Sequence, residues 1–197
     1  MGGKQISLSV IGAGLAAACI YALAFRPWLL RWGTTPDEVS KSLPGDLLVP
    51  RPNSTATRAI TINAPPERVW PWIVQIGQRR GGFYSYVWLE NLVGCEIANA
   101  ESIHPEWQEL KPGDAVRLHP KFPAIPVAIV ERNQALVLGG RGDPAYHIPP
   151  VSWAFILEPV SGNAWSCVPR AETPGYFSTE ARGTPEPRLA SLFKPSI

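Results

Sequence analysis

The sequence predicts an α+β domain with an antiparallel sheet, preceded by a single transmembrane helix. Three observations support this fold class: an apolar run at 6–25, two short helical patterns that follow one strand pattern, and several strand patterns after residue 114. The order strand, two helices, then strands is typical of domains in which helices and an antiparallel sheet are segregated. The chain has 197 residues, of which 45% are hydrophobic, so one domain can bury a core.

The apolar run at 6–25 has the length and composition of a membrane anchor. It carries three polar side chains and no charge. Twenty residues of α-helix span about 30 Å, which is the thickness of the hydrocarbon core of a bilayer. Basic residues flank the run on both sides, and Trp28 and Trp32 follow it where an interfacial aromatic belt is expected. We therefore expect a single-pass membrane protein anchored by residues 6–25.

Residues 12–17 (GAGLAA) also fit the G-x-G-x-x-A turn of dinucleotide-binding folds. That turn requires an amphipathic helix after it and an acidic residue about 20 residues further on, at the end of a second strand. Here no helix face is charged, and Pro27 and Pro36 leave no room for the second strand. The anchor is therefore the favoured interpretation. Cleavage of a signal peptide after Ala24 and a lipoprotein site at Cys19 are the alternatives.

Charge, cysteine and histidine content argue against several functions. The net charge of +2, with no dense cluster of Lys and Arg, does not favour a nucleic-acid partner. The three cysteines lack C-x-x-C spacing and the three histidines lack i, i+4 spacing, so we predict no metal site. We also expect no cofactor. The flanking charges favour the cytoplasmic side of a bacterial inner membrane only slightly, and the sequence indicates no oligomeric state.

The first half of the chain after the anchor is predicted as a linker, a strand and a helix. The segment 26–55 is rich in turn-forming residues and reads as the linker. Residues 56–64 alternate in the manner of a half-buried strand. A helix is predicted over 66–77, because four of its apolar residues share one face at helical spacing. Pro71 is expected to kink or shorten this helix.

A second short helix is predicted over 85–94, with its apolar positions at Val87, Leu89 and Leu92. Residues 1–5 form a short tail before the anchor, the domain spans 56–170, and a proline-rich tail follows over 171–197. The remaining strands are predicted at 115–118, 126–132, 134–140, 151–159 and 165–170, the second and third of them forming a hairpin turned by Arg132-Asn133.

The segment TRAITINAPPERVWPWIVQIGQRRGGFYSYVWLENLVG (57–94) resembles the membrane-anchored branch of the SRPBCC superfamily, also called START-like or polyketide-cyclase/lipid-transport-like. The resemblance extends over roughly residues 26–159 and includes HPEWQELKPGD, LVLGG and SWAFILEP. It implies a helix-grip fold, in which a curved antiparallel sheet wraps a long C-terminal helix and a hydrophobic cavity lies between them. Members of the superfamily bind lipids, sterols, polyketides or hormones, and some catalyse cyclisation or hydrolysis.

The chain departs from the family pattern at two places. Val87 stands where the family usually has Asp, as in Y-S-Y-D-W, so any polar role of that Asp is lost. After SWAFILEP, five prolines between Pro169 and Pro195 exclude the long helix that should close the cavity. We interpret this end as a frameshifted or degenerate 3′ end, which leaves the closing helix missing.

Aromatic residues are the candidate ligand contacts, because they offer large apolar surfaces and, in tyrosine, a hydroxyl that can orient a ligand. Arg80 and Asn91 are candidate anion or polar contacts. Core packing, an exposed turn and solvated helix positions are the alternative interpretations of these residues. No catalytic residue is predicted, because Glu106 and Glu109 have no fixed acid–base partner beside them. The aromatic candidates are Trp70, Phe83, Tyr84, Tyr86, Trp88, Trp107 and Trp153.

These observations lead us to expect a membrane-anchored START-like domain that binds a hydrophobic small molecule or lipid in an internal cavity. A binding protein is favoured over an enzyme. One alternative is a cyclase-like or hydrolase-like enzyme that uses the same cavity. The other is a truncated product that has no function or acts only through interactions, as the proline-rich end of the chain suggests.

Overall fold

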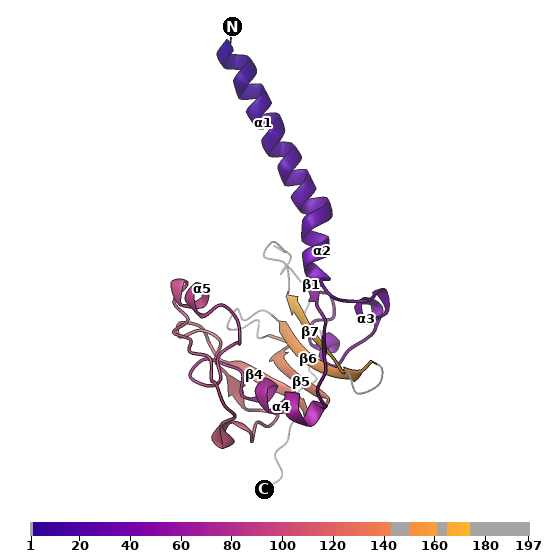
Figure 1. The fold of residues 1–197 in the computed structure, drawn as a ribbon, viewed down its shortest axis with the longest axis vertical. Helices are drawn as coiled ribbons and strands as arrows, with labels where there is room; N and C mark the ends of the chain where they lie inside the picture. Colours follow the sequence, from indigo (N-terminus) through magenta and orange to yellow (C-terminus); the bar gives the residue numbers. More distant parts are fainter. Residues whose placement is uncertain (1, 143–149, 161–164, 174–197) are drawn as a thin grey trace, which may run out of the picture.

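The computed structural model describes residues 2–142, 150–160 and 165–173, and the α+β class with an antiparallel sheet is confirmed (Figure 1). A seven-stranded sheet forms the domain, short helices lie around it, and one long helix precedes it. The predicted absence of a closing C-terminal helix, and most of the tail at 171–197, lie outside the described residues.

The N-terminal helix projects from the domain as a continuous rod (Figure 1). It consists of α1 (Gly2–Ile20), a π-helical turn, η1 (Tyr21–Phe25), and α2 (Arg26–Leu30). The part that is long and apolar enough to span a membrane is Val10–Leu30, so it ends later than the predicted run at 6–25. The helix continues through a proline in α2 because the π-helical turn just before it already departs from regular i→i−4 hydrogen bonding.

The sheet has the strand order β1–β7–β6–β5–β4–β3, and β2 also pairs with β7. All of these pairings are antiparallel. The strands are β1 (Ser54–Thr57), β2 (Ile60–Ile62), β3 (Ala115–Val116), β4 (Ile125–Glu131), β5 (Ala135–Gly140), β6 (Val151–Pro159) and β7 (Trp165–Thr173).

Most of the predicted strands are confirmed, and one is divided. The segment 56–64 forms parts of two strands, because the backbone N–H of Ala59 donates to the carbonyl of Trp32 (3.2 Å) rather than to β7. The hairpin of β4 and β5 turns where predicted, and Asn133 adopts a φ of 62° there. Asn tolerates this left-handed conformation better than most residues do.

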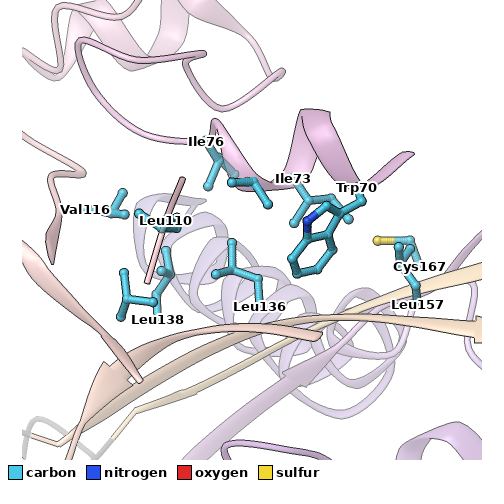
Figure 2. Packing of buried hydrophobic residues seen from close by; sticks show 11 residues of the cluster. Trp70, Ile73, Ile76, Leu110, Val116, Leu136, Leu138, Leu157 and Cys167 are labelled. Carbon is cyan, nitrogen blue, oxygen red and sulfur yellow. The ribbon is translucent and has the colours of Figure 1, made fainter. Parts of the chain in front are cut away.

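One face of the sheet, which we call the inner face, packs against α4 (Pro66–Val74), as the apolar face of that helix predicts (Figure 2). Trp70 and Ile73 of α4 lie over Leu136 and Leu157 of the sheet. This packing removes large apolar side chains from water, which is the main favourable contribution to folding. The same buried cluster also contains Val74, Ile76, Leu110, Val116, Val127, Leu138 and Cys167.

The opposite face of the sheet, the outer face, is covered by residues 36–49, which lie within the segment predicted as a linker. This stretch contains α3 (Pro36–Ser40) and a 3-10 turn, η2 (Asp46–Leu48). It belongs to the folded domain because Leu43 and Leu48 pack against the sheet. Their partners on the outer face are Ala135, Val137, Ala154, Ile156 and Val168.

The second predicted helix is α5 (Val87–Leu92), which is shorter than the predicted 85–94. Its apolar residues face water: Leu89 is 46% exposed and Leu92 is 75% exposed, and no residue of α5 is buried. Figure 1 places α5 at the end of the domain from which the N-terminal helix projects. Helical spacing predicted the helix correctly, but not that its apolar side would point outward.

Candidate functional site

Two of the predicted aromatic residues meet on the inner face of the sheet. The ring centroids of Phe83 and Trp153 are 6.3 Å apart, and those of Trp153 and Phe155 are 4.8 Å apart. Because side chains alternate along a strand, Trp153 and Phe155 share one face of β6, and Ala154 points to the outer face. All three rings pack against the inner core but stay half-buried. We call Phe83, Trp153 and Phe155 the aromatic triplet.

Tyr84, the residue after Phe83, borders an open hollow of about 590 Å³ beside α4 and β2. Its ring meets Trp72 edge-on, with the centroids 5.6 Å apart. Burial raises the pKa of the Tyr84 hydroxyl above its ordinary value, although the hydrogen bond from Gln75 opposes that shift. Most of the lining is apolar. The lining residues are Ile62, Asn63, Ala64, Arg68, Val69, Trp72 and Tyr84.

Gln75 is fully buried and holds three loop residues together. Its Nε2 donates to the Tyr84 hydroxyl (2.5 Å) and to the carbonyl of Ser102 (3.1 Å). Its Oε1 accepts from the backbone N–H of His104 (3.1 Å). Gln75 is not predicted from the sequence, where the one available signal is a lone polar residue inside WIVQIG, whereas Trp72 is among the tryptophans that the sequence offers as candidate cavity-wall or core residues. Since a buried amide requires partners, Gln75 positions the tyrosine that borders the hollow.

Trp70 and Trp107, also predicted as ligand contacts, lie apart from the aromatic triplet. Trp70 is 6% exposed and belongs to the inner core. It also borders a smaller hollow of about 260 Å³ beside Gln108 and Glu109. Trp107 ends the short turn η3 (Pro105–Trp107) and stacks on the His104 ring at 4.3 Å. Trp70 is therefore a core residue that also borders the smaller hollow, and Trp107 packs on the His104 ring.

Tyr86 and Trp88, in contrast with the prediction, do not join the triplet or the hollow. Tyr86 directly precedes α5 and is 69% exposed, and Trp88 within α5 is 68% exposed. The left-handed conformation of Tyr84 (φ 55°) lies just upstream. The chain changes direction at Tyr84, so Tyr86 and Trp88 do not follow Phe83 toward the sheet.

Arg80 and Asn91, the predicted polar contacts, hold loops through backbone groups. The Nη2 of Arg80 donates to the carbonyls of Val74 (3.1 Å) and Trp107 (2.9 Å). Burial lowers the pKa of the Arg80 guanidinium below its ordinary value. The side-chain amide of Asn91 donates to the carbonyl of Ile97 (3.0 Å) and accepts from its N–H (2.6 Å). Arg80 thus links the end of α4 to η3, and Asn91 links α5 to the segment that follows it.

The residues weighed as an acid–base pair do not face the hollow. Glu106 lies 3.3 Å from the Nδ1 of His104, and both side chains are exposed. A hydrogen bond from its own backbone, assisted by His104, lowers the pKa of Glu106. Glu109 is also exposed and borders the smaller hollow. No carboxylate or imidazole lines the hollow beside Tyr84 in the described part of the chain; the titratable groups among its described lining residues are the Tyr84 hydroxyl and the Arg68 guanidinium.

A buried polar cluster on the outer face joins the segment 36–49 to β7. Arg170 is 4% exposed, and its Nη1 lies 2.9 Å from the Asp46 carboxylate. Glu172, two residues along the same strand, is 5% exposed. Burial, with a contribution from the Asp46 charge, raises the pKa of Glu172 to about 7, and the Arg170 charge opposes this shift. The cluster therefore holds a carboxyl group that is protonated more readily than in the unfolded chain.

Replacing Glu172 with glutamine should remove a pH dependence of stability. The folded-state pKa of about 7 lies above the ordinary 4.5, so the native protein binds the proton more tightly than the unfolded chain. The stabilisation that the protonated Glu172 carboxyl contributes is complete below about pH 4.5 and is lost as the pH rises through 7. We expect Glu172→Gln to gain about 1–2 kcal/mol relative to the native chain between pH 4.5 and pH 8. Urea titrations at both pH values measure this. The exposed Glu131→Gln serves as the control, and an equal pH response of both variants would contradict the assignment.

Comparison with known proteins identifies structural neighbours only. No family model and no curated protein matches the chain. A solution structure from Thermobifida fusca is 14% identical, with 61% of this chain and 73% of that chain covered and a TM-score of 0.36. A conserved protein of unknown function from Enterococcus faecalis is 16% identical (65% and 61% covered, TM-score 0.33). A protein from Mesorhizobium loti is 18% identical (64% and 79% covered, TM-score 0.33). These likenesses are too weak to assign a fold family or a function.

Proposed function

We propose that this chain is a membrane-anchored START-like domain of the SRPBCC superfamily that binds a hydrophobic small molecule or lipid. The proposed site consists of the aromatic triplet and the hollow beside Trp72 and Tyr84. The observation that supports it most is the triplet itself. Three large rings gather on one face of the sheet, pack on its core, and still keep exposed surface. An apolar ligand would complete their burial, which is the dominant source of affinity for such molecules.

The helix-grip arrangement that we propose places its ligand on one face of an antiparallel sheet. The inner face of this sheet carries α4 and the aromatic rings, whereas the outer face is already covered by residues 36–49. Among the described residues, the inner face is therefore the one with aromatic surface still open to a ligand. A helix-grip fold binds its ligand on one face of the sheet. The difference between the two faces therefore supports a site on the inner face.

The composition of the hollow favours an amphiphile as the ligand. Ile62, Val69 and Trp72 offer an apolar wall, and among the described lining residues Arg68 is the charged one. A guanidinium binds carboxylate or phosphate oxygens in a bidentate manner. A molecule with an apolar body and an acidic head thus matches the lining, and the lack of an acid–base pair there favours binding over cyclisation or hydrolysis.

The N-terminal helix would hold this site beside a bilayer, where such ligands dissolve. We propose that Val10–Leu30 crosses the membrane once, with the domain on the cytoplasmic side. No residue of Val10–Leu30 is buried against the domain, so the apolar side chains of this stretch are left for the membrane to cover. A reporter enzyme fused to the C-terminus of the full chain tests the side.

Photolabelling of the full chain in lipid nanodiscs tests the binding site. A fatty acid that carries a diazirine is expected to label peptides containing the triplet and Trp72. Trp153→Ala should reduce labelling at the site about tenfold, since a central aromatic contact is worth roughly 1–3 kcal/mol. Ala64→Trp, which fills the hollow without emptying the core, should reduce it as well.

The matched control is Phe122→Ala, because Phe122 is 65% exposed and lies outside the proposed site. Its labelling should equal that of the unaltered chain, and thermal unfolding of each variant checks that the fold persists. Labelling confined to the N-terminal helix, with no adduct on the inner face, would refute the proposed site.

A further inference from the structure

We propose that α5 and its flanking residues form a second contact with the bilayer, in the interfacial layer of lipid headgroups. This contact rests on the proposed membrane insertion of Val10–Leu30. It assigns a role to Tyr86 and Trp88, which the binding site does not use. The ligand of this surface is the lipid surface itself, and its consequence is a fixed orientation of the domain on the membrane.

The first support is the arrangement of apolar residues on α5. Trp88 and Leu92 are four residues apart and therefore share one side of the helix. Glu90 lies between them on the other side and is half-buried. A helix on a soluble protein shows the opposite arrangement, with apolar residues inward. The exposed fractions are 69% for Tyr86, 68% for Trp88, 46% for Leu89, 75% for Leu92 and 65% for Val93.

The second support is that the domain is fixed to the end of the N-terminal helix. The Nε of Arg58 donates to the carbonyl of Leu29 (3.3 Å), and the N–H of Ala59 donates to the carbonyl of Trp32 (3.2 Å). Gly33 has a φ of 78° and lies so close to the Ala59 carbonyl that no other side chain fits. The junction is therefore a packed turn between the helix and the start of β2, and it sets how the domain faces the membrane.

The third support is the position of α5 relative to that junction. In Figure 1, α5 lies at the end of the domain from which the N-terminal helix projects, at about the level of β1, where the helix meets the domain. A bilayer that surrounds Val10–Leu30 therefore lies on the same side as α5. Continuity with this span identifies the bilayer as the partner, rather than a second protein.

The chemistry of the surface matches the interfacial layer. Trp and Tyr are enriched at membrane interfaces, where the ring meets acyl chains and the polar atom meets water. Leu89 and Leu92 add aliphatic surface, as in helices that lie in the membrane plane. Trp28 and Trp32, at the domain end of the N-terminal helix, are 57% and 53% exposed. Two aromatic groups from separate parts of the chain would thus lie at one membrane depth.

Spin-label accessibility measured on the full chain in nanodiscs tests this contact. The native Cys19 is replaced with serine, and a nitroxide is attached at Leu92→Cys, at Leu47→Cys or at Leu15→Cys. Leu47 is the matched control, because it is 79% exposed against 75% for Leu92 and lies outside α5. We expect the label at 92 to have an oxygen-to-nickel-chelate accessibility ratio several-fold higher than the label at 47. Trp88→Cys provides an independent reading.

The outcomes separate this contact from the anchor. Equal ratios at 92 and 47, together with a lipid-accessible label at 15, would overturn the α5 contact and leave the anchor intact. An aqueous label at 15 would overturn the anchor and this contact with it. A high ratio at both 92 and 15 supports the two-point attachment.

Discussion

Replacing Arg170 with methionine is expected to lower the free energy of unfolding by about 3–5 kcal/mol. The guanidinium is 4% exposed, and methionine fills a similar volume without a charge. Its loss would leave the half-buried Asp46 carboxylate near Glu172 without a cation. It would also leave several acceptors without a donor. These acceptors are the carbonyls of Glu38, Val39 and Lys41, the Asp46 carboxylate and the Thr57 hydroxyl.

Chemical denaturation of the full chain in detergent, followed by tryptophan fluorescence, measures this loss. Arg170→Lys should be intermediate, because it keeps the charge but loses the planar set of donors. The exposed Arg51→Met is the matched control and should change stability by no more than about 0.5 kcal/mol. Because Arg170 holds residues 36–49, limited proteolysis of the variant should cut first in that segment. A loss below about 1 kcal/mol would show that the outer face is held by its apolar contacts alone.

Replacing Leu136 with alanine is expected to cost about 2–5 kcal/mol. Leu136 is the second residue of β5, is completely buried, and packs beneath Trp70 and Ile73 of α4 (Figure 2). The substitution removes apolar surface from the core and leaves a cavity that the rigid sheet cannot close. A loss near the upper end of the range would show that α4 and the sheet do not move together to fill the space.

The matched control is Leu47→Ala, the same change at a residue that is 79% exposed. Its free energy of unfolding should stay within about 0.5 kcal/mol of the unaltered chain, as is usual for surface positions. Equal effects at positions 47 and 136 would contradict the assignment of the inner core. The same denaturation experiment serves both variants.

The fold brings some of the aromatic candidates into contact and leaves others apart. Phe83 and Trp153 lie in different segments, and both were predicted, because each is aromatic within a strong local pattern. Phe155 packs on Trp153 but was not among the sequence candidates, since it lies within an ordinary strand pattern. The contact between Phe83 and Trp153 depends on how the loop after α4 packs against the sheet. The spacing of residues within either segment does not predict that packing.

The predicted polar contacts show the same limit. Arg80 and Asn91 are predicted as anion or polar contacts, and both side chains form hydrogen bonds with backbone groups of the protein. Conversely, Gln75 and Arg170 carry hydrogen bonds that organise the two faces, and neither was a sequence candidate, although Gln75 is a lone polar residue in an apolar stretch. A side chain's partners are set by burial, and burial is decided by residues distant in the chain.

Periodicity and composition alone determined the N-terminal apolar helix, the antiparallel strands β4 to β7, and the apolar side of α4. These follow from local rules: the bilayer thickness sets helix length, and side chains alternate along a strand. Tertiary structure decided the rest. In the folded chain, residues 36–49 pack on the outer face, and the apolar side of α5 faces water. The fold also brings the rings of the aromatic triplet into contact. The physical reason is that only a finished sheet has two faces to cover, and which segment covers each face depends on packing between distant residues.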